Sequence, residues 1–262
     1  MASLRSTIES LAQEGEDYVI DAPEEWAQGR TLYGGMSAAL AYAAVRRAHG
    51  DVGPLRSAQF ALIGPSTGRL RFRTQVLRQG RSSTVIGADC FNAAGISTRA
   101  TFVFGAARES VVAHQFVRAP AVPPPDACER FHQTEKKLPG FLGQFEFRLA
   151  AGARLFETEK KPEFAVWTRF ADPDEGDPVT ALLAIADALP CAAMANFPKP
   201  APLSTMTWSV DVKQPLAAHT PWRLITSSSE SAADGYSLQA MQVFNEAGEL
   251  LALARQVVAI FA

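Results

Sequence analysis

An internal repeat runs through this 262-residue chain and limits the folds open to it. The segment LRSAQFALIGP of the first half corresponds to LSTMTWSVDVKQP of the second, and QGRSSTVIGADCFNAAG corresponds to ADGYSLQAMQVFNEAG. Between the halves, residues 119–130 contain four prolines within seven residues, which favours an extended connector and excludes a helix. A duplication of about half the chain therefore predicts an N-terminal unit over 1–106, a linker region over 107–143 and a C-terminal unit over 144–262.

Each half contains one apolar helix. An alanine-rich stretch predicts a helix over 32–50, with a pair of glycines near its start and Gly50 as its stop signal. The apolar run of residues 180–198 predicts a second, buried helix over 178–189, which ends as the chain reaches proline.

Strands follow each helix. Residues 70–76 alternate between apolar and polar, the period of a half-buried strand, and the turns NAAG and NEAG join later strands at hairpin spacing. One helix followed by four or more antiparallel strands, twice over, predicts an α+β fold. In it, two antiparallel sheets each wrap around a central helix and pack side by side as a pseudo-dimer within one chain.

Composition excludes several classes of function. The net charge of −2 gives no reason to expect nucleic acid or an anionic membrane as partner. The N-terminal sequence has no apolar core of signal-peptide length, and Asp187 and Pro190 interrupt the longest apolar stretch, which argues against a membrane span. Three widely spaced cysteines indicate free thiols in a reducing cytoplasm. The four histidines lack metal-ligand spacing, so no metal and no cofactor are expected; they are His49, His114, His132 and His219.

Asp187 stands out inside the apolar run LLAIADALP. Ionising a carboxyl group away from water costs several kcal/mol, so such a group is kept when it is paired, faces a wet cleft or does chemistry. A satisfied core aspartate, or a local cap near Pro190, is the structural alternative to catalysis. The residues by themselves favour neither the structural role nor the catalytic role.

The layout of LYGGMSAALAYAA, LIGPSTGRLRFRTQVLRQGRSSTVIGADCFNAAG and a late Asp/Thr/Gln set resembles the TesB-type acyl-CoA thioesterases, which are double hotdog proteins. The resemblance covers roughly residues 15–262. It implies that Asp187, Thr205 and Gln256 match the catalytic residues of that family. One departure is that RSAQFALIGP lacks the histidine often found before the corresponding strand, which bears on substrate range more than on the chemistry.

These residue types suit thioester hydrolysis. Asp187 would take a proton from water or, as the less favoured route, attack the carbonyl and form an anhydride. Thr205 and Gln256 can hold the water in line with the carbonyl. The amides of Gly34 and Gly35, or those at the start of the 178–189 helix, are candidate oxyanion donors.

Each of these residues also has a plain structural reading. Thr205 is an ordinary strand residue type, Gln256 can simply face solvent, and the two glycines can serve helix–sheet packing. In the first half of the repeat, Ser57 takes the place of Thr205, and the counterpart of Gln256 lies near Thr101. The helix of the first half contains no acid. We therefore expect one active site per chain.

The expected function is hydrolysis of acyl-CoA in cytoplasmic fatty acid metabolism, by a chain that forms a homodimer. The first alternative is a hotdog protein that binds acyl-CoA without turnover, as a sensor or scaffold. A hotdog hydratase or dehydratase ranks third because no D-x-x-x-x-H occurs. The arginines of residues 69–81, with Arg46 and Arg47, can meet coenzyme A phosphates, but a solvated strand face is the favoured interpretation.

Overall fold

The structure, a computed structural model, describes residues 3–131, 139–217 and 219–261. Part of the predicted linker region and His132 lie outside these ranges. The helices are α1 (Leu4–Glu9), α2 (Gly34–His49) and α3 (Pro178–Ala186), with 3₁₀ turns η1 (Glu24–Trp26), η2 (Pro125–Ala127), η3 (Gly140–Gln144) and η4 (Ala192–Asn196).

Most of the described elements are strands. They are β1 (Ala12–Glu14), β2 (Asp17–Asp21), β3 (Ala27–Gln28), β4 (Thr31–Leu32), β5 (Leu55–Leu62), β6 (Arg69–Gln79), β7 (Ser83–Asn92), β8 (Gly95–Gly105), β9 (Glu129–Arg130), β10 (Phe145–Gly152), β11 (Glu163–Phe170), β12 (Leu203–Val212), β13 (Arg223–Ala233), β14 (Tyr236–Asn245) and β15 (Leu250–Ile260). The α+β class predicted from the sequence is confirmed.

One continuous 13-stranded sheet replaces the two sheets that the sequence predicts. Its order is β1-β2-β6-β7-β8-β5-β12-β15-β14-β13-β11-β10-β9, so the strands of the two halves are arranged in mirrored order about the β5–β12 pair. These two strands pair antiparallel, with Phe60 opposite Trp208 and their rings stacked at 5.2 Å. An exposed sheet edge carries unpaired N–H and C=O groups, and here each half satisfies the edge of the other.

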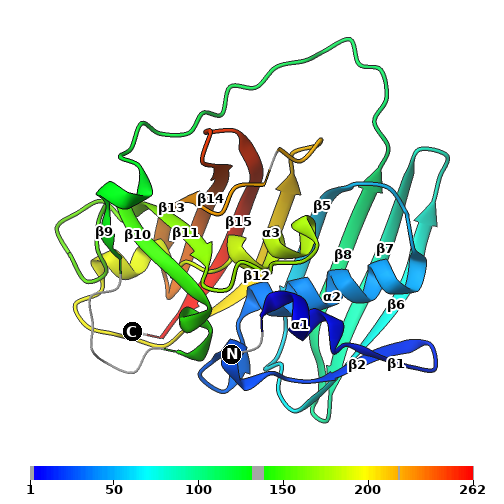
Figure 1. Ribbon diagram of the computed structural model, residues 1–262. Coiled ribbons are helices and arrows are strands. Elements are labelled where there is room, and N and C mark those ends of the chain that lie inside the picture. Colours follow the sequence, from blue (N-terminus) through cyan, green and yellow to red (C-terminus); the bar gives the residue numbers. More distant parts are fainter. Residues whose placement is uncertain (1–2, 132–138, 218, 262) are drawn as a thin grey trace.

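Helix α2 lies against one face of the sheet and contacts β6, β7 and β8 (Figure 1). Its residues 35–45 are all buried, which suits the small alanine side chains of this stretch. As predicted, the helix stops at Gly50, which has a positive φ of 63° and donates its N–H to the carbonyl of Arg46.

Helix α3 is shorter than predicted. It ends at Ala186, so Asp187 is its C-cap residue and does not lie within the helix. Pro190 explains the early end, because its ring has no N–H and would clash with the carbonyl of Ala186 four residues back. The rest of the apolar run forms η4 in place of further α-helix.

The start of α2 meets the end of α3 at very close range. The Tyr33 hydroxyl donates to the carbonyl of Ala184 at 2.9 Å and so satisfies one of the carbonyls left free at the helix end. A Cβ atom on Gly35 would lie 2.5 Å from the same carbonyl oxygen, and one on Gly34 would lie 2.6 Å from Oδ2 of Asp187. Only glycine allows this approach.

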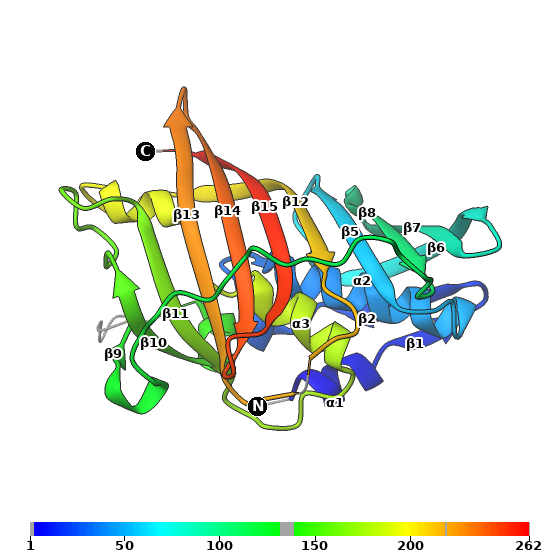
Figure 2. The ribbon, with the colours of Figure 1, turned by 90° about the horizontal axis from the view of Figure 1, so that it is seen from above.

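The proline-rich connector crosses the sheet face opposite the helices (Figure 2). Val117, Ala119 and Val122 pack against an apolar cluster that includes Trp167 and Trp222. The indole N–H of Trp167 donates to the carbonyl of Pro123 at 2.8 Å. The connector is thus extended, as predicted, and covers apolar surface of the second half.

We expect Gly35→Ala to lower the free energy of unfolding by about 2 kcal/mol or more, because the new methyl group would press on a backbone oxygen that has no room to move. Gly143→Ala is the matched control, since a Cβ there has no atom within 4 Å, and it should stay within about 0.5 kcal/mol of the parent. Urea unfolding of the three proteins makes the comparison. Equal stability of both variants would show that the two helix ends do not meet this closely.

Candidate active site

Asp187 accepts hydrogen bonds from two directions. Its Oδ1 accepts from Nε2 of Gln256 on β15, and its carboxylate also accepts from the backbone N–H of Gly35 in the first turn of α2. The residue is half-buried and so keeps partial contact with solvent. Both partners are donors, so the ionised form of Asp187 is the form that fits its surroundings.

Three influences determine the charge state of Asp187. Burial is the largest and raises the pKa of its carboxyl from 3.8 to about 7, while the hydrogen bonds from Gln256 and Gly35 act to lower it. The C-terminus of α3 adds unfavourable negative potential and the N-terminus of α2 adds favourable positive potential. The group therefore exchanges its proton near neutral pH, the range that suits a general base.

Gln256 faces the interior of the fold. It lies opposite Trp208 in the β12–β15 ladder and is 6% exposed, which excludes the reading that it faces solvent. The structure thus brings Asp187 and Gln256, predicted together from the sequence, into direct contact.

Thr205 lies beside this pair without touching it. It pairs with Val258, and a bulge at Met206 keeps it on the same sheet face as Gln256, at a diagonal position roughly 7–8 Å away in a regular ladder. Within the described parts of the chain, no hydrogen bond joins Thr205 to Asp187 or Gln256.

The candidate oxyanion donors differ in whether their N–H groups already have a hydrogen-bond acceptor. The Gly35 amide is used by Asp187, whereas Gly34, as the first residue of α2, has an N–H without a partner inside the helix. The start of α3 lies at the far end of that helix from Asp187, and its Asp177 carboxylate accepts from the Thr180 N–H at 2.8 Å. Gly34 is the candidate that stays open.

A buried amide behind Gln256 escaped the sequence reading. Gln239 on β14 is 1% exposed, accepts from the backbone N–H of Ala192 at 2.6 Å and donates to Oε1 of Gln256 at 3.0 Å. The sequence did contain an indication of its burial. Met241 and Val243 are core residues, and the alternation of the strand places Gln239 on the same face.

The first half holds no equivalent pair. Ala100 lies opposite Phe60 as Gln256 lies opposite Trp208, so Ala100 takes the corresponding place and the neighbouring Thr101 points the other way. Helix α2 carries no acid. A single Asp–Gln pair of this kind is consistent with one site per chain.

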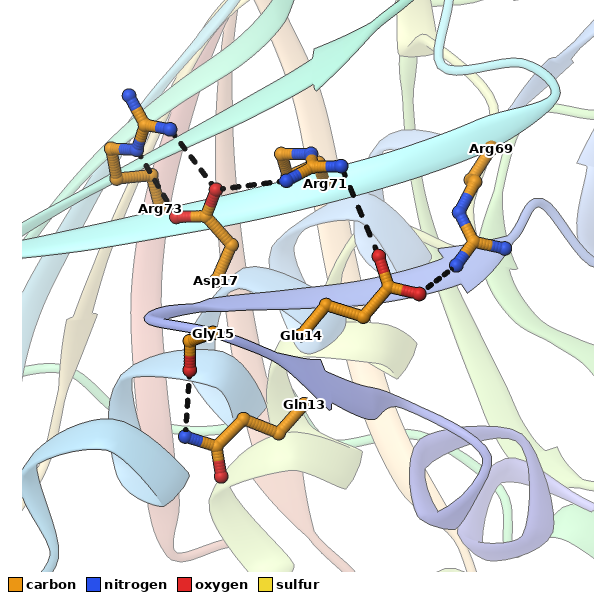
Figure 3. A network of polar contacts seen from close by, with 7 residues as sticks. All are labelled: Gln13, Glu14, Gly15, Asp17, Arg69, Arg71 and Arg73. Atoms are coloured by element: carbon orange, nitrogen blue, oxygen red, sulfur yellow. Dashed lines mark hydrogen bonds and ion pairs between the residues drawn. The ribbon is translucent and has the colours of Figure 1, made fainter.

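Three of the four arginines of β6 contact acidic side chains (Figure 3). Arg73 contacts Asp17 through Nε at 3.1 Å and Nη2 at 3.0 Å, Arg71 approaches the same carboxylate at 3.4 Å, and Arg69 pairs with Glu14. The Arg73 hydrogen bond is the main reason that the pKa of Asp17 is lowered, since burial opposes the shift. This arrangement is that of a paired, solvated strand face.

Two other features of the molecule do not include Asp187. The stretch GPSTG (64–68) has the G-x-S-x-G pattern of serine hydrolases, but it lies between two strands, without the helix that such an elbow requires, and its buried Ser66 donates to the Ser97 hydroxyl at 3.2 Å. A depression of about 500 Å³ near the β5–β12 seam is lined by twelve residues, which include Arg99, Arg255 and Gln256 but not Asp187. Each arginine there already pairs with an acid.

Two features are absent from the described residues. No helix in that part of the chain is both long and apolar enough to cross a membrane. Over the same residues, no group of three or more His, Cys, Asp or Glu side chains is placed to hold a metal ion.

Three solved structures resemble this one over nearly the whole chain. A conserved protein of unknown function with a hot dog fold from Alicyclobacillus acidocaldarius has a TM-score of 0.87 at 24% identity, covering 98% of this chain and 97% of that one. The tesB protein of Mycobacterium avium subs paratuberculosis has a TM-score of 0.81 at 20% identity (99% and 98%). Acyl-CoA thioesterase II TesB2 of Mycobacterium marinum has a TM-score of 0.75 at 19% identity (97% and 96%). These likenesses show a shared hotdog fold.

Comparison with curated protein sequences gave no match. Two family models do match: the acyl-CoA thioesterase N-terminal domain over residues 22–105 and the acyl-CoA thioesterase C-terminal domain over residues 125–260. Because the two matches together span most of the sequence, the chain belongs to the acyl-CoA thioesterase family.

Proposed function

We propose that this protein hydrolyses acyl-CoA thioesters to a free acid and coenzyme A, with Asp187 as the general base. The observation that carries the proposal is a half-buried carboxylate, held by two N–H donors, whose pKa is raised to about 7. Membership of the acyl-CoA thioesterase family supplies the substrate class.

In the proposed mechanism, Asp187 accepts a proton as water attacks the thioester carbonyl carbon. Gln256 holds the carboxylate in place, and Thr205, on the same sheet face, orients the water. The Gly34 amide, backed by the positive end of the α2 dipole, is placed to stabilise the developing oxyanion. Collapse of the intermediate breaks the C–S bond, and the proton held by Asp187 passes to the departing thiolate.

General-base catalysis is favoured over direct attack by Asp187. A carboxylate that accepts two N–H hydrogen bonds has its lone pairs partly engaged and is a weaker nucleophile, whereas it can still accept a proton from a water molecule. The partial exposure of Asp187 supports access of that water.

We also propose that the chain is a fused pair of hotdog units, over 1–106 and 144–262, joined by the 107–143 region. The mirrored strand order about β5 and β12 supports this, as does the pairing of Phe60 with Trp208 at the centre of the sheet. The second unit contributes Asp187, Thr205 and Gln256, and the first contributes the start of α2. Neither unit has a complete site alone.

Asp187→Asn keeps the side-chain volume and removes the base, so we expect turnover of acyl-CoA to fall about 100-fold or more while the fold is retained. Thiol release from a panel of acyl-CoAs, followed with a thiol-reactive dye, measures it. Asp211→Asn, at an exposed position on β12, is the control and should hydrolyse like the parent. If Asp187→Asn and parent release thiol equally fast, Asp187 is structural. Saturable binding by the parent with no release would support the sensor or scaffold alternative.

The pH dependence follows from the same carboxyl. The base must be ionised, so we expect kcat/KM to rise with pH through an apparent pKa near 7 and then level off. Steady-state rates from pH 5 to pH 9, on an acyl-CoA stable over that range, give the profile. An acid limb centred near pH 4, the value of an unperturbed aspartate, would contradict the environment described for Asp187.

A further inference from the structure

Gln239 is a buried amide that the proposed mechanism does not use. It is 1% exposed, lies directly opposite Gln256 in the β14–β15 ladder and points to the same face. Its Oε1 accepts from the Ala192 amide at 2.6 Å, and its Nε2 donates to Gln256 at 3.0 Å and also lies 3.4 Å from the Met241 sulfur. A polar group this deep costs free energy unless each of its atoms is engaged, and here each is.

The chain of hydrogen bonds from Ala192 to Asp187 has only one consistent direction. A backbone N–H can only donate, so the oxygen of Gln239 must face Ala192 and its NH₂ group must face Gln256. Gln256 must then present its oxygen to Gln239 and its NH₂ group to Asp187. The backbone at the start of η4 thus determines which end of the Gln256 amide meets the carboxylate.

We propose that Gln239 is a positioning residue, which locks the Gln256 amide in the orientation that donates to Asp187 and so keeps Asp187 available as the base. This inference rests on the proposed function. Without Gln239, the Gln256 side chain can turn over and place its oxygen against the carboxylate, which repels it. Asp187 would then hold its proton more tightly, and the water would lose an oriented partner.

Two titratable groups on the elements next to Asp187 are kept neutral by burial. From the start of α2, Tyr33 lies close enough for its charge to matter, and burial together with Asp187 raises the pKa of its hydroxyl well above 10, so it stays neutral. Cys191, on the segment after α3, has a thiol whose pKa burial also raises. A shift of the acid limb in a Gln239 variant therefore reports on Asp187.

A double-mutant cycle tests the proposal. Gln239→Met keeps the length of the side chain and removes both hydrogen bonds, and we expect kcat/KM to fall about 10-fold, the scale of one hydrogen bond to a charged group. The acid limb should move to higher pH. In a Gln256→Met background the same change should alter kcat/KM by less than about 2-fold, because the group through which Gln239 acts is gone. Gln242→Met, on the opposite face of β14, is the control and should match the parent.

Equal losses with and without the Gln256 side chain would overturn the proposal, since Gln239 would then act by packing. A Gln239→Met variant with the kcat/KM and the pH profile of the parent would also overturn it. If Gln256→Met alone has no effect, Gln239 has no positioning role, while Asp187→Asn still tests the proposed function separately. Should Gln239→Met fail to fold, Gln239→Glu retains an acceptor for Ala192 but as a carboxylate cannot donate to Gln256. Measured at pH 9, where its new carboxyl group is ionised, Gln239→Glu should lower kcat/KM by about 10-fold in the parent and by less than about 2-fold in the Gln256→Met background. Equal losses in both backgrounds would overturn the proposal.

Discussion

The start of α2 and the end of α3 meet at one point, where the Tyr33 hydroxyl donates to the Ala184 carbonyl and the Gly35 amide donates to the carboxylate of Asp187. A negative charge at the C-terminus of α3 is disfavoured by the dipole of its own helix. The N-terminus of α2 reverses that penalty by presenting a free N–H and a positive potential at the same point. The two contributions require the helices to meet end to end, which the glycine pair permits.

Keeping the Asp187 carboxyl group partly desolvated at this junction lowers the stability of the fold at neutral pH. Because the pKa of Asp187 is raised in the folded state, folding is favoured below pH 3.8, where the group is protonated in both states. That contribution is lost as pH rises from about 4 to about 7, since the folded state must then give up a proton that it binds more tightly than the unfolded chain does. Hydrogen bonds from Gln256 and Gly35, together with the Gln239 amide behind them, limit the loss and hold the carboxylate in one position. A reactive base near neutrality is obtained by keeping it partly desolvated.

Much of the fold follows from local sequence patterns. The stop of α2 at Gly50 and the alternation in β6 were predictable because a positive φ and a half-buried strand leave clear residue signatures. The merger of the two sheets into one was not predictable, because the residues of β5 and β12 do not indicate that these two strands will pair with each other. Pro190 predicts the end of the second helix at residue 189, whereas the helix ends at Ala186 and leaves Asp187 as the C-cap. For the site, the resemblance to the TesB-type thioesterases named Asp187 and Gln256, which the structure brings into contact. Gln239 and the use of the Gly35 amide depend on contacts between distant segments.

Direct titration of the Asp187 carboxyl is the sharpest measurement of this account. With ¹³C-labelled aspartate, the carboxyl carbon of Asp187 is assigned by its loss in Asp187→Asn, and its chemical shift is followed from pH 3 to pH 9. A midpoint near 7 is expected for a carboxyl that is desolvated yet held by two N–H donors. A midpoint near 4 would mean that the group is solvated like an ordinary surface aspartate, and the site described here would not exist in solution.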